Sequence, residues 1–285
     1  MLPTQQIPIG FHVTIGGNQP FTWIAGPCAM ENESQVWTTA EELKRLSEKW
    51  GISLIFKSSF DKANRSSIHS PRGMGMEAGL KLLAKIREEL QIPVTTDVHE
   101  SWQCSEVGEV VDVLQIPAFL ARQTDLLVAA ARTGKVVNVK KGQFMAPDDM
   151  HQVVGKLLEC GNAKILLCER GSCFGYHQLV VDMTSLVEMR KEGFPIVFDA
   201  THSVQKPGGN GTSTGGNREH VPYLMNAAAA IGVDAIFTEV HPDPDQAISD
   251  AANQLPLSQV ETILAQAIRF DQIAKSALVL ERNMP

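Results

Sequence analysis

Eight short runs of β-branched or apolar residues, separated by longer segments, constrain the fold of this chain most strongly. Turn-forming or polar residues bound each run, as they bound buried strands. The runs are Thr22–Ala25, Ser53–Phe56, Val94–Val98, Val113–Ile116, Val136–Val139, Ile165–Cys168, Ile196–Phe198 and Ala235–Thr238. Almost every gap between neighbouring runs has helical periodicity, so the pattern predicts eight β-then-α units.

The helical segments are amphipathic, as helices that cover a sheet must be. Ser34–Lys49 places Val36, Leu43 and Leu46 on one face, and Met76–Leu90 has the same periodicity. Eight such units favour an α/β fold of the closed (β/α)8 TIM barrel type, with an open doubly wound sheet as the alternative. We expect residues 1–285 to form a single barrel domain, because barrels of roughly 250 residues are common.

Two further segments stand outside the repeating pattern. Residues 1–21 are expected to form an N-terminal extension, in which Ile7–Pro20 makes a short β-hairpin that turns at Gly16-Gly17-Asn18. Lys206–Asn217 is a glycine-rich segment between the seventh strand and its helix. Loops on this side of a barrel build active sites, so we interpret it as a lid rather than a tolerated surface insertion.

Composition excludes several classes of protein. No run of about 18 apolar residues suggests a membrane span, and the chain start lacks a secretory signal, so we expect a cytoplasmic protein. The net charge of −7 argues against a nucleic-acid surface. Five widely spaced cysteines do not suggest a disulfide framework, so a special cysteine is more readily a ligand or a nucleophile.

Basic side chains follow the carboxyl ends of several predicted strands, where barrel enzymes carry their active sites. Lysine and arginine bind phosphate as a point charge and as a bidentate fork, and hydroxyl and amide groups add donors. Two clusters suggest two phosphate-bearing ligands, although any one of these cations alone could be a solvated surface residue. The candidate binding residues are Lys57, Lys62, Asn64, Arg65, Ser66, Gln115, Arg122, Lys140, Arg170 and His202.

A second set of side chains is suited to a metal ion. Cys28, His202, Glu239 and Asp250 follow the first, seventh and eighth strands, which are neighbours in a closed barrel. A thiolate, an imidazole and two carboxylates fit a divalent ion such as Fe²⁺, Zn²⁺, Mn²⁺ or Co²⁺. Spacing alone leaves two alternatives open: His99 and His241 are competing ligands, and a lone cysteine is usually a small buried apolar group.

Several stretches resemble the 3-deoxy-D-manno-octulosonate 8-phosphate synthases. They are KSSFDKANRSSIHSPRG at 57–73, QIPAFLARQTDL at 115–126, NVKKGQF at 138–144, FDATHSVQ at 198–205 and HPDPDQAISD at 241–250. The similarity extends from about Phe21 to Lys275. Related 3-deoxy-arabino-heptulosonate 7-phosphate synthases usually show a KPRTS-like run in place of KANRSS, so the resemblance favours the octulosonate enzymes.

The resemblance implies a reaction and a cofactor. Members of that family condense phosphoenolpyruvate with D-arabinose 5-phosphate and water, in the synthesis of the sugar acid of lipopolysaccharide. Metal-dependent members carry Cys at the end of the first strand, where metal-independent members carry Asn. Cys28 therefore places this chain among the metal-dependent enzymes, with His202, Glu239 and Asp250 as the other ligands.

The resemblance also implies roles for individual residues. Lys62, Lys140 and Arg170 match residues that hold phosphoenolpyruvate, with Lys57 and Gln115 nearby. Asn64, Arg65 and Ser66 match the arabinose-phosphate site. Family members are commonly homotetramers, in which Arg65 and Ser66 reach a neighbour's site. Catalytic roles are expected for Lys140, as a candidate proton donor, and for His202 and Asp250.

Two other functions remain as alternatives. One is a heptulosonate-type synthase that uses erythrose 4-phosphate. The other is a non-catalytic barrel that binds sugar phosphates, which would need the phosphate-binding cations but not the full metal set.

Overall fold

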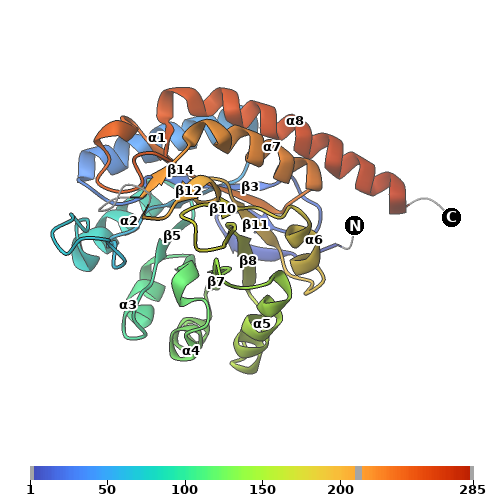
Figure 1. Ribbon diagram of the computed structural model, residues 1–285, viewed down its shortest axis with the longest axis horizontal. Helices are drawn as coiled ribbons and strands as arrows, with labels where there is room; N and C mark the ends of the chain where they lie inside the picture. The colour runs from blue at the N-terminus through green and yellow to red at the C-terminus, as the bar shows by residue number, and fades with distance from the viewer. Residues whose placement is uncertain (1–2, 209–213, 283–285) are drawn as a thin grey trace.

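A closed barrel of eight parallel strands forms the centre of the molecule (Figure 1). The computed structural model describes residues 3–208 and 214–282, with side chains as far as Ala277. The barrel strands are β3 (Thr22–Gly26), β4 (Leu54–Lys57), β5 (Val94–Asp97), β6 (Val113–Ile116), β7 (Val136–Lys140), β8 (Ile165–Glu169), β11 (Ile196–Asp199) and β14 (Ala235–His241). Because β14 pairs with both β11 and β3, the barrel closes and the open-sheet alternative is excluded.

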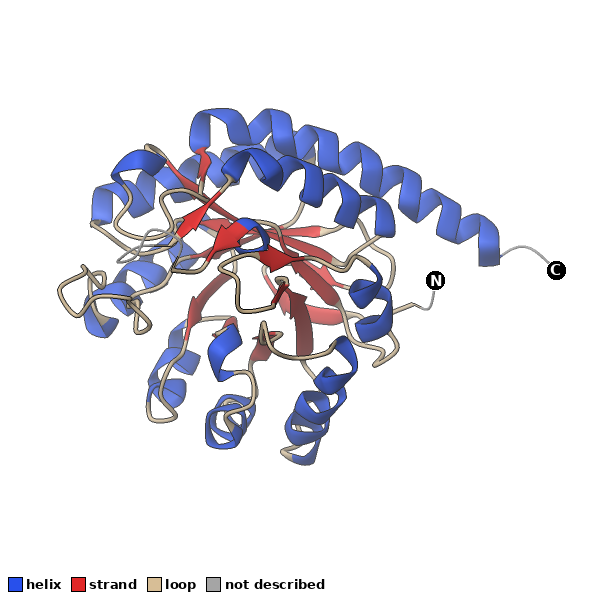
Figure 2. Ribbon diagram, in the orientation of Figure 1, coloured by secondary structure: helices blue, strands red, loops and turns tan. Residues whose placement is uncertain are grey.

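Eight helices surround the strands within the described residues (Figure 2). The first, α1, spans Glu33–Trp50, within one residue of its predicted start and end, and Asn32 caps it by accepting a hydrogen bond from the backbone of Gln35. The second helix, α2 (Met76–Leu90), matches its prediction at both ends. The remaining α-helices are α3 (Gln103–Val110), α4 (Thr124–Arg132), α5 (Met150–Glu159), α6 (Thr184–Arg190), α7 (Val221–Ile231) and α8 (Leu257–Arg282).

The core has two layers. Apolar residues on the outer face of the strands pack against the helices, and Val36, Leu43 and Leu46 of α1 belong to that layer as predicted. A second cluster fills the barrel interior with residues such as Ile24 and Phe237. Each strand is therefore apolar on both faces, which explains why the strands appear in the sequence as unbroken apolar runs.

The predicted N-terminal hairpin exists, but its predicted turn is wrong. Strands β1 (Ile7–Gly10) and β2 (Val13–Ile15) pair antiparallel, and the chain reverses at Phe11 and His12, whose φ angles are 45° and 65°. Gly16 follows the second strand instead. A Cβ there would lie 1.9 Å from the carbonyl oxygen of Gln5, so this glycine serves close packing rather than the hairpin turn.

The hairpin covers the amino-terminal end of the barrel. Its residues Ile7, Val13 and Ile15 are buried in the same cluster as the barrel interior. The preceding chain is also anchored, because the backbone of Gln5 donates to the carbonyl of Gly193 at 2.8 Å. With this end closed, ligands reach the barrel from the opposite end.

Short additional strands lie at the carboxyl-terminal end of the barrel. They pair as β9 (Ser172–Cys173) with β10 (Leu179–Val180), and as β12 (Gln205–Lys206) with β13 (Gly215–Gly216), while β15 (Leu255–Pro256) pairs with β14. The β12–β13 pair forms the base of the glycine-rich segment predicted to be a lid. Residues 209–213 of that segment lie outside the described residues, so the lid stays a prediction.

No helix among the described residues is both long enough and apolar enough to span a membrane. The sequence prediction made the same statement from the absence of long apolar runs.

Asp234 ties the closed end of the barrel together. This buried carboxylate accepts hydrogen bonds from the Thr4 hydroxyl and from the backbone of Ile196, each at 2.9 Å, and lies 3.3 Å from the Arg190 guanidinium. Arg190 is itself buried and donates to the carbonyl of Gly232 at 2.6 Å. Both partners of this ion pair are buried, so the Arg190 charge is balanced by the Asp234 carboxylate and not by water.

We therefore predict that Asp234→Ala lowers the free energy of unfolding by about 3–5 kcal/mol, because it leaves the Arg190 charge buried without its partner. Urea unfolding followed by circular dichroism measures the change. The matched control is Asp245→Ala, which removes a largely exposed carboxylate from its ion pair with the half-buried Arg218 and should cost at most about 1 kcal/mol. Equal effects of the two substitutions would contradict this assignment.

Candidate active site

Polar side chains at the carboxyl ends of the strands line a cavity of about 610 Å³. The structure brings together nearly all of the residues that the sequence placed there. Cys28 lies fully buried beside the cavity and not on its wall. The predicted residues on the wall are Lys57, Lys62, Asn64, Arg65, Ser66, Gln115, Lys140, Arg170, His202, Glu239 and Asp250.

Arg122 is the predicted binding residue that the structure places elsewhere. Its side chain is exposed after the short helix η1 (Ala118–Leu120), and it does not line the cavity of its own chain. Arg65 and Ser66, which the resemblance assigns to a neighbour's site, line the cavity of their own chain.

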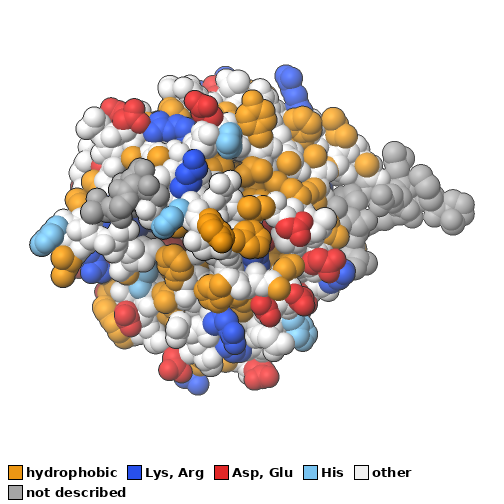
Figure 3. Space-filling model, in the orientation of Figure 1, with side chains coloured by type: hydrophobic (Ala, Val, Ile, Leu, Met, Phe, Trp, Pro, Cys, Tyr) orange, Lys and Arg blue, Asp and Glu red, His pale blue; other side chains and the backbone are white. Residues whose placement is uncertain are grey.

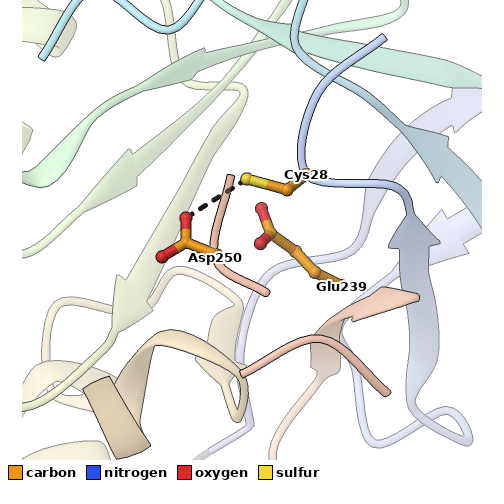
Figure 4. Close-up of side chains that lie close together, drawn as sticks. All are labelled: Cys28, Glu239 and Asp250. Atoms are coloured by element: carbon orange, nitrogen blue, oxygen red, sulfur yellow. Dashed lines mark hydrogen bonds between the residues drawn. The ribbon is translucent and has the colours of Figure 1, made fainter. Parts of the chain in front are cut away.

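Cys28, Glu239 and Asp250 converge on one point (Figure 4). One candidate ligand atom from each lies within 4.8 Å of those of the other two. The Cys28 thiol lies 3.2 Å from Oδ2 of Asp250, and buried Oε2 of Glu239 has no hydrogen-bond partner among the residues that the structure describes. A buried carboxylate oxygen without a donor is open to a cation, so these residues fit a divalent ion.

His202 faces this group from the side. Its Nε2 lies 3.6 Å from Oε1 of Glu239 and 3.8 Å from Oδ2 of Asp250. Its Nδ1 lies 2.8 Å from Oδ2 of Asp199, a carboxylate that accepts only, so Asp199 turns Nε2 toward the carboxylates. His202 thus approaches the three-residue group without being part of it in this structure.

The two competing histidines lie apart from this group. His99 lines the cavity and packs edge-on against Phe60, with ring centroids 6.1 Å apart. His241 lies 3.3 Å from the carboxylate of Glu31 and accepts a hydrogen bond from the backbone of Asp243. Neither is brought into the cysteine-containing group.

Backbone geometry at Asp250 is unusual. Its φ angle is 51°, in the left-handed region that aspartate tolerates better than most residues. Such strain persists only where surrounding contacts hold it, and it is concentrated at functional sites. The carboxylate is correspondingly well held, by Cys28 on one oxygen and by Gln205 on the other.

Two of the cavity lysines are paired with carboxylates. Lys57 is buried and its ammonium lies 3.1 Å from Glu239 and 3.5 Å from Asp97. Lys140 lies 2.5 Å from Asp199 and 3.8 Å from the centre of the Phe237 ring. These lysines neutralise the acidic side of the cavity and hold its carboxylates in place.

The other cavity cations have no carboxylate within ion-pair distance among the residues that the structure describes. Among the described residues, the Lys62 ammonium donates only to the Ser59 hydroxyl, at 3.3 Å. Arg65 donates to the hydroxyl of Ser249 and the carbonyl of Ile248. Arg170 is buried, its Nη2 donates to Gln205 at 2.6 Å, and its Nη1 has no partner. Buried or half-buried charge without a counter-ion is the environment that an anionic ligand completes.

The electrostatic state of the cavity follows from these contacts. Burial would raise the pKa of Asp199, but His202 and Lys140 hold it well below its usual range. Burial would lower the pKa of Lys140, but Asp199 outweighs it and raises the pKa. Burial, followed by the charge of Glu239, raises the pKa of the Cys28 thiol well above its ordinary value. The lysine therefore keeps its proton at neutral pH, and the buried thiol holds its proton more tightly than an ordinary cysteine does.

The sequence places Asp97, Glu169 and Asp199 at strand ends, but sequence reasoning gave them no role, and it gave none to Gln205. Strand-end position was the available signal for the three acidic residues. Glu169 accepts hydrogen bonds from the backbone of Arg170 and Gly171, which orients the arginine. The contacts of Gln205 come from residues far away in the chain, so no local pattern could have revealed them.

Known proteins are similar to this chain over most of its length. The family model described as DAHP synthetase I family matches residues 4–276. Proteins named 2-dehydro-3-deoxyphosphooctonate aldolase are similar over nearly the whole chain. The relative from Fusobacterium nucleatum is 58% identical, covering 93% of this chain and 95% of its own; that from Syntrophotalea carbinolica is 55% identical, covering 92% and 95%; and that from Geobacter sp. strain M21 is 55% identical, covering 95% and 98%.

Identity at this level over almost the full length of both chains leaves no large part of the barrel unmatched. The chain therefore belongs to the DAHP synthetase I family and, within it, to the 2-dehydro-3-deoxyphosphooctonate aldolases, which are also called 3-deoxy-D-manno-octulosonate 8-phosphate synthases.

Proposed function

We propose that this chain is an enzyme that condenses phosphoenolpyruvate with D-arabinose 5-phosphate and water, giving 3-deoxy-D-manno-octulosonate 8-phosphate and inorganic phosphate. The relatives' shared name supports the reaction. The observation that carries the proposal is the set of cavity cations without carboxylate partners, Lys62, Arg65 and Arg170. A reaction between two phosphorylated substrates requires such groups.

Each substrate has its own cations in this proposal. Lys62, Lys140 and Arg170 hold phosphoenolpyruvate, with Lys57 and Gln115 beside them. Gln115 is fixed in orientation, because it donates to Asp97 and accepts from Asn138. Asn64, Arg65 and Ser66 hold the phosphate of the sugar at the cavity rim, and Arg122 is a binding residue only if a second copy of the chain brings it to the site.

The chemistry needs charge to move between the substrates. C3 of phosphoenolpyruvate attacks the aldehyde carbon of the sugar, water adds at C2, and phosphate leaves. Lys140 carries a proton within the cavity and is the candidate donor to the aldehyde oxygen as it becomes a hydroxyl. Fixed cations stabilise the developing charges without having to reorganise. His202, whose Nδ1 lies 3.5 Å from Nζ of Lys140, and Asp250 orient the reacting groups.

The proposed cofactor is a divalent ion, Fe²⁺, Zn²⁺, Mn²⁺ or Co²⁺, held by Cys28, His202, Glu239 and Asp250. When bound, it supplies Lewis-acid polarisation of the water or of the aldehyde oxygen. The convergence of three of these residues and the unpartnered oxygen of Glu239 support the assignment.

The proposal extends to a homotetramer in the cytoplasm. Exposed aromatic side chains on segments that follow strand ends, Phe119, Phe144, Phe174 and Tyr176, support assembly, because apolar groups gathered on a surface favour contact with another protein. Apolar side chains also gather near the centre of the face shown in Figure 3.

One test of the proposed function concerns the choice of sugar substrate. Released phosphate, measured with a coupled assay, should appear with phosphoenolpyruvate and arabinose 5-phosphate, and the four-carbon erythrose 4-phosphate should support a much slower rate. The heptulosonate-type activity is the second candidate because the matching family model carries that name. Preference for erythrose 4-phosphate would replace the proposed function with that one.

The second prediction concerns Arg170. Arg170→Ala should lower kcat/KM for phosphoenolpyruvate by roughly 10²–10³-fold, because it removes a preorganised charge from the reacting anion. Arg170→Lys should recover part of the loss, since it restores charge without the bidentate fork. The control is Arg269→Ala, an exposed arginine of α8. A loss smaller than about twofold in Arg170→Ala would remove this residue from the site.

The third prediction concerns the ion. Cys28→Ala should bind Mn²⁺ or Zn²⁺ at least about tenfold more weakly, because it removes a ligand, and Cys173→Ala, a half-buried cysteine outside the group, should bind as the wild type does. Metal content after dialysis, measured by atomic absorption, reports the change. Cys28→Asn should also lose metal yet keep some activity, by resemblance to relatives that carry Asn. Unchanged metal content and rate in Cys28→Ala would refute the assigned ligand set.

A further inference from the structure

Gln205 joins the two halves of the cavity. It is the first residue of β12 and is almost fully buried. Its side-chain Oε1 accepts from Nη2 of Arg170 at 2.6 Å, and its Nε2 donates to Oδ1 of Asp250 at 2.6 Å. One amide thus connects the unpaired arginine of the anion-binding side to a carboxylate of the cysteine-containing group.

The orientation of this amide is determined by chemistry. A guanidinium can only donate hydrogen bonds and an ionised carboxylate can only accept them. The oxygen of Gln205 must therefore face Arg170 and its nitrogen must face Asp250. A flipped amide would place donor against donor and acceptor against acceptor, so each partner helps to hold the amide for the other.

Each partner depends on Gln205 to a large degree. Among the described residues, Gln205 is the side chain that hydrogen-bonds to the guanidinium of Arg170, and Nη1 of the guanidinium has no partner. For Asp250, Gln205 holds Oδ1, which leaves Oδ2 facing Cys28 and His202. The left-handed backbone at Asp250 makes its position dependent on such contacts.

The backbone around Gln205 is itself held firmly. β12 pairs with β13, where a Cβ on Gly216 would lie 1.6 Å from Oδ1 of Asn253, so these segments pack in direct contact. The backbone of Asn253 in turn donates to the carbonyl of Asp250 at 2.9 Å. Asp250 is therefore connected to the β12–β13 pair through Asn253 as well as through the Gln205 amide.

We propose that Gln205 is a positioning residue that couples the anion-binding arginine to the metal-binding carboxylate, so that phosphoenolpyruvate and the divalent ion bind cooperatively. With an ion held by Cys28, Glu239 and Asp250, the Asp250 carboxylate would be fixed, the Gln205 amide would keep its orientation, and Arg170 would be held with Nη1 available to the anion. Thermodynamic linkage makes the effect reciprocal: phosphoenolpyruvate tightens the binding of the ion by the same factor. This inference rests on the proposed function.

The test compares two dissociation constants for phosphoenolpyruvate, one in EDTA and one at saturating Mn²⁺, by isothermal titration calorimetry on the full chain. In the wild type, Mn²⁺ should tighten binding by at least about fivefold. In Gln205→Met, which keeps the size of the side chain and loses both hydrogen bonds, the ratio should fall to within about twofold of one. Gln246→Met, the same change at an exposed glutamine, should keep the wild-type ratio.

A second variant gives an effect of known direction. Gln205→Glu places a carboxylate against Arg170, which pairs with the guanidinium and competes with the ligand. Its affinity for phosphoenolpyruvate in EDTA should therefore be at least about tenfold weaker than that of the wild type. Thermal unfolding of each variant separates these effects from loss of the fold.

The outcomes separate the two proposals. Wild-type protein that fails to bind phosphoenolpyruvate in either condition overturns the proposed function and this inference with it. Wild-type protein that binds the ligand, with an unchanged ratio in Gln205→Met or an unchanged affinity in Gln205→Glu, overturns the positioning role alone. A ratio lost in Gln205→Met and retained in Gln246→Met supports it.

Discussion

Cations held at the carboxyl ends of the strands without carboxylate partners are the constraint on which the rest of the site depends. Withdrawing a guanidinium such as that of Arg170 from water costs several kcal/mol unless a counter-charge or hydrogen bonds replace the lost solvation. Gln205 supplies one neutral acceptor, and Nη1 is left without any. The fold tolerates this cost at the end of the barrel that is open, while the hairpin and Asp234 close and stabilise the other end.

The cavity separates its charges by function. Lys57 and Lys140 are paired with acids and hold them, whereas Lys62, Arg65 and Arg170 remain available to ligands. The cysteine-containing group lies at the junction of β3 and β14, and the free cations come from the segments after β4 and β8. The site thus has a cation-rich side and a cysteine-containing side, which Gln205 connects between Arg170 and Asp250, and which Ser249 connects between Arg65 and Asp250.

Much of the fold could be predicted from the sequence because the relevant signals are local. Strands buried on both faces appear as continuous apolar runs, and all eight were found within a few residues of their true positions. The hairpin turn was assigned wrongly because a glycine cluster at 16–18 resembles a turn. Those glycines permit close packing against an earlier part of the chain, and Phe11 and His12 adopt left-handed backbone instead.

The candidate site was predictable where strand-end position identified its members, and not where pairing decides their role. Lys57 and Lys62 look alike in the sequence, yet Lys57 lies 3.1 Å from Glu239, whereas among the described residues no carboxylate lies within ion-pair distance of Lys62. That difference depends on a residue nearly two hundred positions away. Gln205 is an ordinary glutamine until the fold brings Arg170 and Asp250 to its two ends.

A crystal structure of the protein with phosphoenolpyruvate and Mn²⁺ would show directly whether the cavity cations bind the anion and the cysteine-containing group binds the ion. We expect ligand density against the guanidinium of Arg170 and the ammonium of Lys62, and an anomalous peak between Cys28, Glu239 and Asp250. Ligand bound away from these cations, or an ion bound outside that group, would contradict it.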